Sequence, residues 1–339
     1  MAVGIDIGTK TVKVVEIAKE GDKFALAGAG VVGYSGTDIA HIQDEKGLVD
    51  LATLIKKLFK DAGISSKDVA VALPESQVFT RAISFPLLTE QEIASAVKWE
   101  AEQYIPFPVA EAIVQHQIIE RRENTTPPGV IVLLVASPRT LVEKYIKLLT
   151  LAGLNAVAVE TELISLVRAI APPNQTTLIA DFGASSTDIA IAKNGQLVFS
   201  RSVPTGGDAF SRAIAQNLGV NQAQAEEYKK TYGFQTTQLE GKVGVALDPV
   251  FRIISEEIKK SVSFYQSEGK GEAPSSLILT GGTSGLPEAT PRLSKALGIE
   301  VSIGNPFARI TIDAQTAKSL AGYAPLYSIA VGLAMRTDF

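Results

Sequence analysis

The chain has 339 residues, with 32 Lys and Arg against 36 Asp and Glu and no cysteine, and its formal net charge is −4. The lack of cysteine excludes disulfides, thiolate metal sites and cysteine nucleophiles, and the acidic balance argues against a protein that binds nucleic-acid phosphates. At about 150 residues per domain, this length predicts roughly two domains. The apolar runs are far shorter than the ~20 residues of a membrane-spanning helix, so we expect a cytoplasmic protein without a membrane span.

Two similar groups of three strands are predicted, one at the start of the chain and one near its middle. The expected strands are 3–7, 11–18 and 24–32 in the first group, and 177–182, 186–192 and 196–203 in the second. Asp6-Ile7-Gly8 corresponds to Asp181-Phe182-Gly183, and each follows an apolar strand. Repetition at this long spacing predicts two domains of one α/β architecture, joined by a linker at 171–174.

A different kind of segment lies between the two groups. Thr89 and Glu92 have the spacing of a capping box, which predicts a helix towards Tyr104. The two prolines in 105–108 end this helix, because proline cannot continue the hydrogen-bond pattern. Two strands and a further helix that starts at Pro138 follow, so residues 86–150 are expected to form a small αββα module inserted into the first domain.

Both strand groups place an aspartate at a strand end beside a glycine-containing turn. Backbone N–H groups in such turns can bind phosphate oxygens, and glycine permits close approach. The candidate phosphate-binding residues are Gly8, Thr9, Lys10 and Thr11 in the first turn, and Gly183, Ala184, Ser185, Ser186 and Thr187 in the second. Asp6 and Asp181 are candidate metal ligands, because Mg²⁺ can join one or two carboxylates to phosphate.

A third glycine-containing turn ends an apolar strand further along the chain. Gly281, Gly282 and Thr283 are therefore candidate contacts to a nucleoside. The three turns, in this order, resemble the two phosphate motifs and the adenosine motif of the actin-like ATPases. This resemblance implies a duplicated actin-like, ribonuclease H-like α/β fold whose two domains enclose a cleft for ATP and Mg²⁺. It also implies that Glu226 and Lys229 contact the ribose or base.

Residues 97–108, VKWEAEQYIPFP, are similar to a segment of the PilM family of type IV pilus assembly proteins, and the resemblance extends over nearly the whole chain. PilM in turn resembles the FtsA family in its inserted subdomain, called IC. The resemblance implies an ATP-binding cytoplasmic scaffold, peripheral to the inner membrane, that docks the short cytoplasmic tail of a PilN-like membrane protein. Other pilus motor or platform proteins are further candidate partners, and no nucleic acid is expected.

The same resemblance divides the chain into subdomains. These are IA at 1–85 and 151–172, IC at 86–150, IIA at 173–215 and 275–326, IIB at 216–274, and a C-terminal inter-domain helix at 327–339.

Hydrolysis of ATP would need a group that positions water at the γ-phosphate. Glu160 lies at a strand end before the first inter-domain helix and is the catalytic candidate, although an acid at a helix start is also favoured by the helix dipole. We therefore expect nucleotide binding with slow or absent hydrolysis. The alternatives are a small-molecule kinase of the sugar or acetate type, which shares the fold, and a secretion or division scaffold similar to FtsA.

Overall fold

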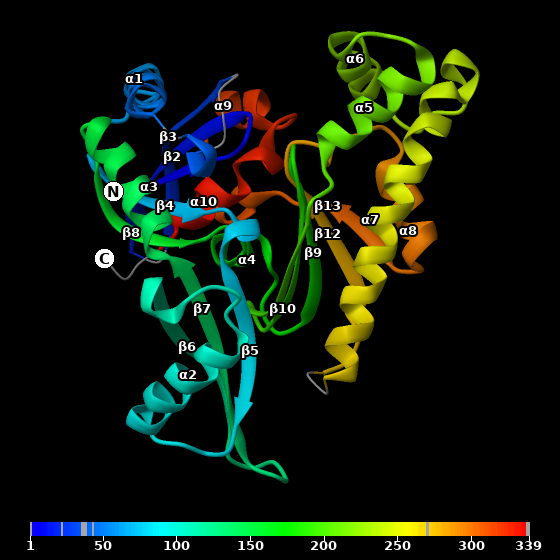
Figure 1. Cartoon of the computed structure of the whole chain (residues 1–339). Helices are drawn as coiled ribbons and strands as arrows, with labels where there is room; N and C mark the ends of the chain where they lie inside the picture. Colours follow the sequence, from blue (N-terminus) through cyan, green and yellow to red (C-terminus); the bar gives the residue numbers. More distant parts are fainter. Residues whose placement is uncertain (1, 22, 35–38, 43, 269–270, 337–339) are drawn as a thin grey trace.

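The computed structural model describes residues 2–21, 23–34, 39–42, 44–268 and 271–336 (Figure 1). Its strands form two large mixed sheets and one small antiparallel sheet. Helices cover both faces of the large sheets, and two of the helices pack between them. Within the described residues, no helix combines the length and the hydrophobicity needed to cross a bilayer.

The first domain contains a six-stranded sheet in the order β14-β3-β2-β1-β4-β8. Its strands are β1 Ala2–Ile7, β2 Thr11–Glu20, β3 Lys23–Gly33, β4 Asp68–Leu73, β8 Asn155–Thr161 and β14 Ile310–Thr311. One face packs on α1 (Glu45–Asp61) and α3 (Arg139–Leu151), and the other packs on α4 (Glu162–Ile170) and α10 (Ser328–Ala334). Alternation along the strands supplies apolar side chains to both faces.

The second domain contains a five-stranded sheet in the order β11-β10-β9-β12-β13. Its strands are β9 Thr176–Phe182, β10 Thr187–Lys193, β11 Gln196–Val203, β12 Ser276–Thr280 and β13 Glu300–Ile303. Its helices are α5 Gly207–Leu218, α6 Gln222–Tyr232, α7 Lys242–Ser267 and α8 Ala289–Leu297. This strand order matches the order β3-β2-β1-β4-β8 of the first sheet. In both orders the first three strands pair antiparallel and the remaining pairs are parallel, so the predicted duplication is confirmed.

The inserted subdomain consists of β5 (Phe79–Phe85), α2 (Glu90–Tyr104), β6 (Ala112–Arg122) and β7 (Gly129–Pro138), with the strands in the order β5-β7-β6. The predicted capping box is confirmed, because Thr89 and Glu92 exchange both hydrogen bonds and α2 ends before Ile105. The prediction of an inserted αββα module at residues 86–150 is wrong at its start and at its end. β5 belongs to this sheet, whereas α3 packs in the core of the first domain.

The chain returns to the first domain earlier than expected. β14 pairs in parallel with β3, so the segment after β13 leaves the second sheet before residue 326. A two-residue strand carries too little periodicity to be predicted from sequence. α9 (Ala314–Leu320) follows, and α10 lies within the predicted C-terminal helix at 327–339, whose last three residues are outside the described part.

Candidate functional site

A cleft of about 490 Å³ lies between the two domains, and all three glycine-containing turns line it. The predicted site residues that line this cleft are Asp6, Gly8, Thr9, Lys10, Thr11, Asp181, Gly183, Ala184, Ser185, Ser186, Glu226, Lys229, Gly281, Gly282 and Thr283. β9 and β12 are parallel neighbours in the second sheet, so the second and third turns lie at the carboxyl edge of that sheet, and the turn after β1 reaches the same cleft from the first sheet.

The two phosphate turns are held by hydrogen bonds within the turn and from outside it. In the first turn, Gly8 N–H donates to Thr11 O at 3.1 Å, and the Tyr34 hydroxyl donates to Gly8 O at 2.8 Å. In the second turn, the first N–H groups of α5 donate to the carbonyls of Gly183 and Ala184, at 2.9 and 2.8 Å. The second turn therefore sits against a helix N-terminus, where the dipole favours anions.

The adenosine-like turn depends on one glycine. Gly281 has a φ of +88°, and a Cβ atom there would lie 2.0 Å from Oδ1 of Asp181. Only glycine can adopt this conformation beside the carboxylate without a clash. Gly281 therefore allows β12 to approach the second phosphate turn closely.

Buried acids form the floor of the cleft. Lys13 Nζ donates to Asp6 Oδ2 at 2.8 Å, and both side chains are almost fully buried. Burial, followed by the charges of Asp188 and Asp6, raises the pKa of Asp181 to about 7 against the opposing charge of Lys13. Burial, with the charges of Asp188, Asp6 and Asp181, also raises the pKa of Glu162 well above its usual range. The floor thus holds more acidic groups than the charge of Lys13 can keep ionised.

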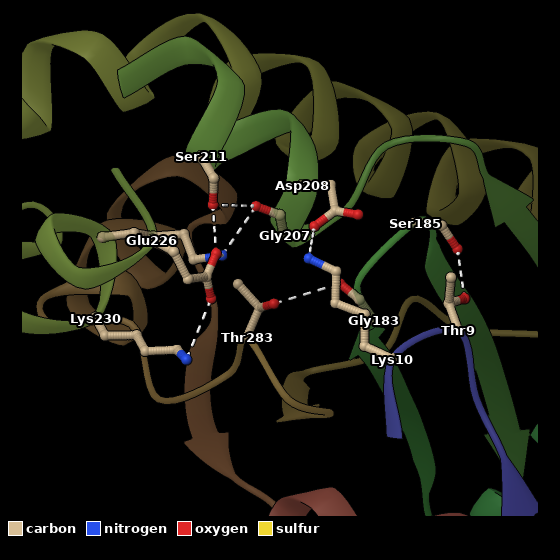
Figure 2. Close-up of polar contacts among 11 residues, drawn as sticks. Thr9, Lys10, Gly183, Ser185, Gly207, Asp208, Ser211, Glu226, Lys230 and Thr283 are labelled. Carbon is tan, nitrogen blue, oxygen red and sulfur yellow. Dashed lines mark hydrogen bonds and ion pairs between the residues drawn. The ribbon is translucent and has the colours of Figure 1, made fainter. Parts of the chain in front are cut away.

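The opposite wall carries a compact network around Glu226 (Figure 2). Its carboxylate accepts hydrogen bonds from Ser211 Oγ at 2.6 Å and Lys229 Nζ at 2.7 Å, and Lys229 also donates to Gly207 O at 3.0 Å. Burial opposes ionisation of Glu226, but the bonds from Lys229 and Ser211 outweigh it and lower the pKa to about 2. An ionised acid and a buried lysine are thereby fixed beside Thr283.

Two polar contacts cross the cleft between the phosphate turns (Figure 2). Thr9 Oγ1 and Ser185 Oγ are 3.0 Å apart, and Lys10 forms an ion pair with Asp208 on the first turn of α5. Lys10 comes from the first domain and Asp208 from the second. These contacts occupy donors that the sequence had suggested for phosphate.

Comparison with known proteins decides the family. The type IV pilus assembly protein PilM family matches residues 4–338. The chain belongs to the PilM family. A solved PilM–PilN type IV pilus biogenesis complex superimposes with a TM-score of 0.85 at 26% identity, covering 99% of this chain and 98% of that chain. The actin-like fold of this PilM-family chain is therefore confirmed.

More distant relatives agree with this fold. The cell division protein FtsA of Streptococcus pneumoniae serotype 2 is 23% identical over 343 residues, which cover 89% of this chain and 75% of the relative. MreB5 of Spiroplasma citri, solved with AMPPNP, has a TM-score of 0.54 at 15% identity and covers 97% of this chain and 93% of that chain. The PilM-family chain thus shares its architecture with bacterial actin-like proteins.

Two predicted residues do not line the cleft of this PilM-family chain. Glu160 forms a bidentate ion pair with Arg168, at 2.6 and 2.8 Å, and lies 3.8 Å from Arg336. Thr187 is buried and donates to Thr205 O at 2.7 Å. Both side chains are committed to contacts within the protein.

The sequence reasoning missed Glu162, which does line the cleft. It is the first residue of α4, and one of its oxygens accepts the Glu75 N–H at 3.0 Å. No local sequence signal separates the two acids, because Glu160 lies near the end of β8 and Glu162 begins α4. The choice between two acids two residues apart still depended on where each side chain points.

The cleft floor fits a divalent cation that is held largely through phosphate and water. Within the described part of the chain, no group of three or more His, Asp or Glu side chains is spaced to hold a metal by itself. Asp188 Oδ1, however, is buried without a hydrogen-bond partner among the described residues, beside Asp181. Mg²⁺ normally keeps several waters and takes only one or two carboxylates, which suits this arrangement.

Proposed function

We propose that this chain is an ATP-binding scaffold of the type IV pilus inner-membrane assembly complex, and that it docks the cytoplasmic tail of a PilN-like membrane protein. The observation that carries the proposal is the match over 99% of the chain to PilM in a PilM–PilN complex. Membership of the PilM family over residues 4–338 supports it. In this proposal the chain is cytoplasmic and reaches the inner membrane only through its partner.

The cleft supports adenine nucleotide as the ligand. Both phosphate turns line the cleft, and their N–H groups other than those of Gly8 and Gly183, which are bonded to Thr11 O and Asp181 O, can donate to phosphate oxygens. Lys10 can exchange Asp208 for phosphate without leaving the cleft. Glu226 is ionised and is held in place by Lys229, so its carboxylate can accept hydrogen bonds from ribose hydroxyls. Mg²⁺, when bound, would supply positive charge that compensates the carboxylates of Asp6 and Asp181.

Slow or absent hydrolysis is expected from the raised pKa of the candidate base. We propose Glu162 in place of Glu160, because Glu162 lines the cleft at the N-terminus of α4. Burial and the neighbouring acids raise the pKa of Glu162 well above its usual range, so its ionised form, which a general base needs, is disfavoured. The rate of ATP hydrolysis then depends on how far positive charge in the cleft restores the ionised form of Glu162.

Calorimetric titration tests the proposal directly. The purified full chain is titrated with a peptide that copies the cytoplasmic tail of the PilN-like protein from the same organism, with and without Mg-ATP. We expect saturable one-site binding of the peptide, and no binding of the same residues in scrambled order. A separate titration with Mg-ATP should also saturate. Lack of peptide binding in both nucleotide states would overturn the docking proposal, and lack of nucleotide binding would overturn the cleft assignment.

A further inference from the structure

The cleft has a solvent-exposed apolar side beside the adenosine-like turn. Ile303 lies at the end of β13, next to β12, Tyr323 follows α9, and both residues line the cleft. They are 44% and 64% exposed, although large apolar and aromatic side chains are usually buried. The backbone of Gly282 and Gly285, in and after the turn, also lines the cleft and is exposed. An uncovered apolar surface inside a cleft fits a flat apolar ligand.

The chain segment that carries Tyr323 is fixed to this turn. Thr280 Oγ1, at the end of β12, donates a hydrogen bond to Pro325 O at 3.0 Å. Cδ1 of Leu326 lies 3.3 Å from the position that a Cβ atom would take on Gly282. The Leu326 N–H donates to Tyr323 O at 2.9 Å, which ties Tyr323 to the same segment. The backbone of Tyr323 is therefore held beside the turn, and its exposed side chain lines the cleft.

The hydroxyl groups of the turn are already engaged within the protein. Ser284 Oγ donates to Gly281 O at 2.7 Å, and Thr283 Oγ1 donates to Gly183 O at 3.3 Å. Neither proton is left to bind the edge of a particular base. The backbone groups of Gly282 are exposed, so water can satisfy whichever of them a base leaves unpaired. Strong rejection of a wrong base requires the opposite, a buried polar group that the wrong base leaves unpaired.

Lys230 contributes a charged side chain to the cleft, next to Glu226. Its Nζ lies 3.3 Å from Glu226 Oε1, and its side chain is 71% exposed (Figure 2). An ammonium group donates hydrogen bonds and accepts none. Adenine and guanine both present an acceptor at N7, and guanine adds O6, so a lysine does not exclude guanine. Within the part of the chain that the structure describes, the side chains around the turn thus give no basis for a choice between the two purines.

We propose that Tyr323 stacks on the base of the bound nucleotide, and that the cleft accepts GTP as well as ATP because it recognises the face of the base and not its edge. This inference rests on the proposed function for nucleotide binding, and it adds the residue that contacts the base and the range of bases. Stacking on an aromatic ring tolerates any base, since every base has a π-face, and a purine covers more of the ring than a pyrimidine does.

Calorimetric titration with three nucleotides tests the base preference. The purified full chain is titrated with Mg-ATP, Mg-GTP and Mg-CTP at one pH and one salt concentration. We expect the Kd values for ATP and GTP to differ by less than about tenfold, and CTP to bind more weakly than both. Discrimination of about tenfold or more between ATP and GTP would overturn the inference, because it would show that the edge of the base is read. Binding of CTP as tight as that of ATP would overturn it too.

Replacement of the aromatic ring tests the residue. Tyr323→Ala should weaken binding of ATP and of GTP by the same factor, about tenfold, whereas Tyr323→Phe keeps the ring and should bind both within about twofold of the native chain. The matched control is Trp99→Ala, which removes a similarly exposed ring on α2, outside the cleft, and should leave both affinities unchanged. Native affinity in Tyr323→Ala would overturn the inference, and so would equal losses in Tyr323→Ala and Tyr323→Phe.

Removal of the Lys230 ammonium tests whether an edge contact contributes. Lys230→Met should leave the ratio of the Kd values for ATP and GTP unchanged within about twofold. The matched control is Lys147→Met, which breaks an exposed ion pair with Glu45, at 3.0 Å, inside the first domain. A change in the ratio confined to Lys230→Met would show that Lys230 reads the edge of the base, and it would contradict the inference.

Fluorescence reports the stacking directly. Trp99 is the only tryptophan of the chain, so the double variant Trp99→Phe with Tyr323→Trp carries its single indole at position 323. Mg-ATP and Mg-GTP should both quench this indole, and Mg-tripolyphosphate, which has no base, should not. Calorimetric binding of Mg-ATP by the double variant without quenching would overturn the inference and leave the proposed function intact. Lack of Mg-ATP binding by the native chain would overturn the cleft assignment instead.

Discussion

Asp188 lies opposite Asp181 across the β9–β10 ladder, at the position where Lys13 faces Asp6 across β1–β2. Both pairs are separated by seven residues in the chain. One repeat of the duplicated fold therefore places an ion pair at the cleft, and the other places two acids there. The duplication preserved the backbone register but not the charge, so the floor of the cleft is acidic on the side of the second domain.

The Asp6–Lys13 pair can be tested by Lys13→Met, which keeps the length of the side chain. Removing one partner leaves Asp6 as an uncompensated buried charge, so the free energy of unfolding should fall by about 3–5 kcal/mol in urea titrations. Lys147→Met breaks an exposed pair and should change it by less than about 1 kcal/mol. Equal small effects in both variants would show that Asp6 is compensated in another way.

Glu75 predicts a pH dependence. Burial, followed by the charge of Asp188, raises its pKa from 4.5 to about 7. The folded state holds this proton more tightly than the unfolded state, so its stabilising effect is complete below about pH 4.5 and is lost as the pH rises through about 7. In Glu75→Gln, the part of the pH dependence of the unfolding free energy that comes from this carboxyl should vanish. Above pH 7 the variant should be more stable than the native chain by up to about 3 kcal/mol.

The measurement for Glu75 is the midpoint of urea unfolding between pH 5 and 8, without nucleotide or Mg²⁺. Glu102→Gln, at an exposed position of α2, serves as the control and should follow the native curve. A Glu75→Gln curve parallel to the native one would mean that Glu75 is ionised in the folded protein at neutral pH.

Lys10 and Asp208 predict opposite changes in nucleotide affinity. Asp208 competes with phosphate for Lys10, so Asp208→Asn should tighten binding of Mg-ATP by about threefold to tenfold. Lys10→Ala should weaken binding by about tenfold, because a charge-assisted contact is lost. Calorimetry of both variants checks this, with Lys147→Ala as a charge-matched control that should bind like the native chain. Weaker binding by Asp208→Asn would show that Asp208 serves the nucleotide instead of competing with it.

Gly332 is required by the close approach of α10 to α4. A Cβ atom at this position would lie 1.8 Å from the backbone oxygen of Ser165, which cannot move without displacing α4. Gly332→Ala should therefore destabilise the chain by about 3 kcal/mol or more. Gly322→Ala, where a Cβ atom meets open space, should have an effect within about 0.5 kcal/mol. Thermal unfolding of both variants makes the comparison, and a mild effect at Gly332 would argue against this packing.

Glu160 and Glu162 should behave as a structural and a functional acid. Glu160→Gln breaks the pair with Arg168, so we expect a loss of stability with unchanged single-turnover hydrolysis of ATP. Glu162→Gln should retain nucleotide binding and lower the residual hydrolysis rate by about 100-fold. Single-turnover assays with labelled ATP resolve even slow rates. A hydrolysis defect confined to Glu160→Gln would reverse the assignment.

The sequence by itself determined the features that depend on near neighbours along the chain. Alternation of apolar residues located both strand groups, the Asp6 and Asp181 turns followed from strand ends and glycine, and Thr89 with Glu92 marked the start of α2. These signals are local, since strand periodicity, turn geometry and capping act over a few residues. The meeting of the phosphate turns in one cleft did not follow from these local signals and was implied only by the resemblance to the actin-like ATPases.

Only the tertiary structure decided which distant segments pair. The two residues of β14 join β3 across most of the chain length, β5 joins the inserted sheet, and α3 packs on the first domain instead. Glu162 faces the cleft while Glu160 turns to Arg168, although both are acids at the same strand end. Such choices depend on long-range packing and charge pairing, whose free energies exceed the local preferences that a sequence pattern records.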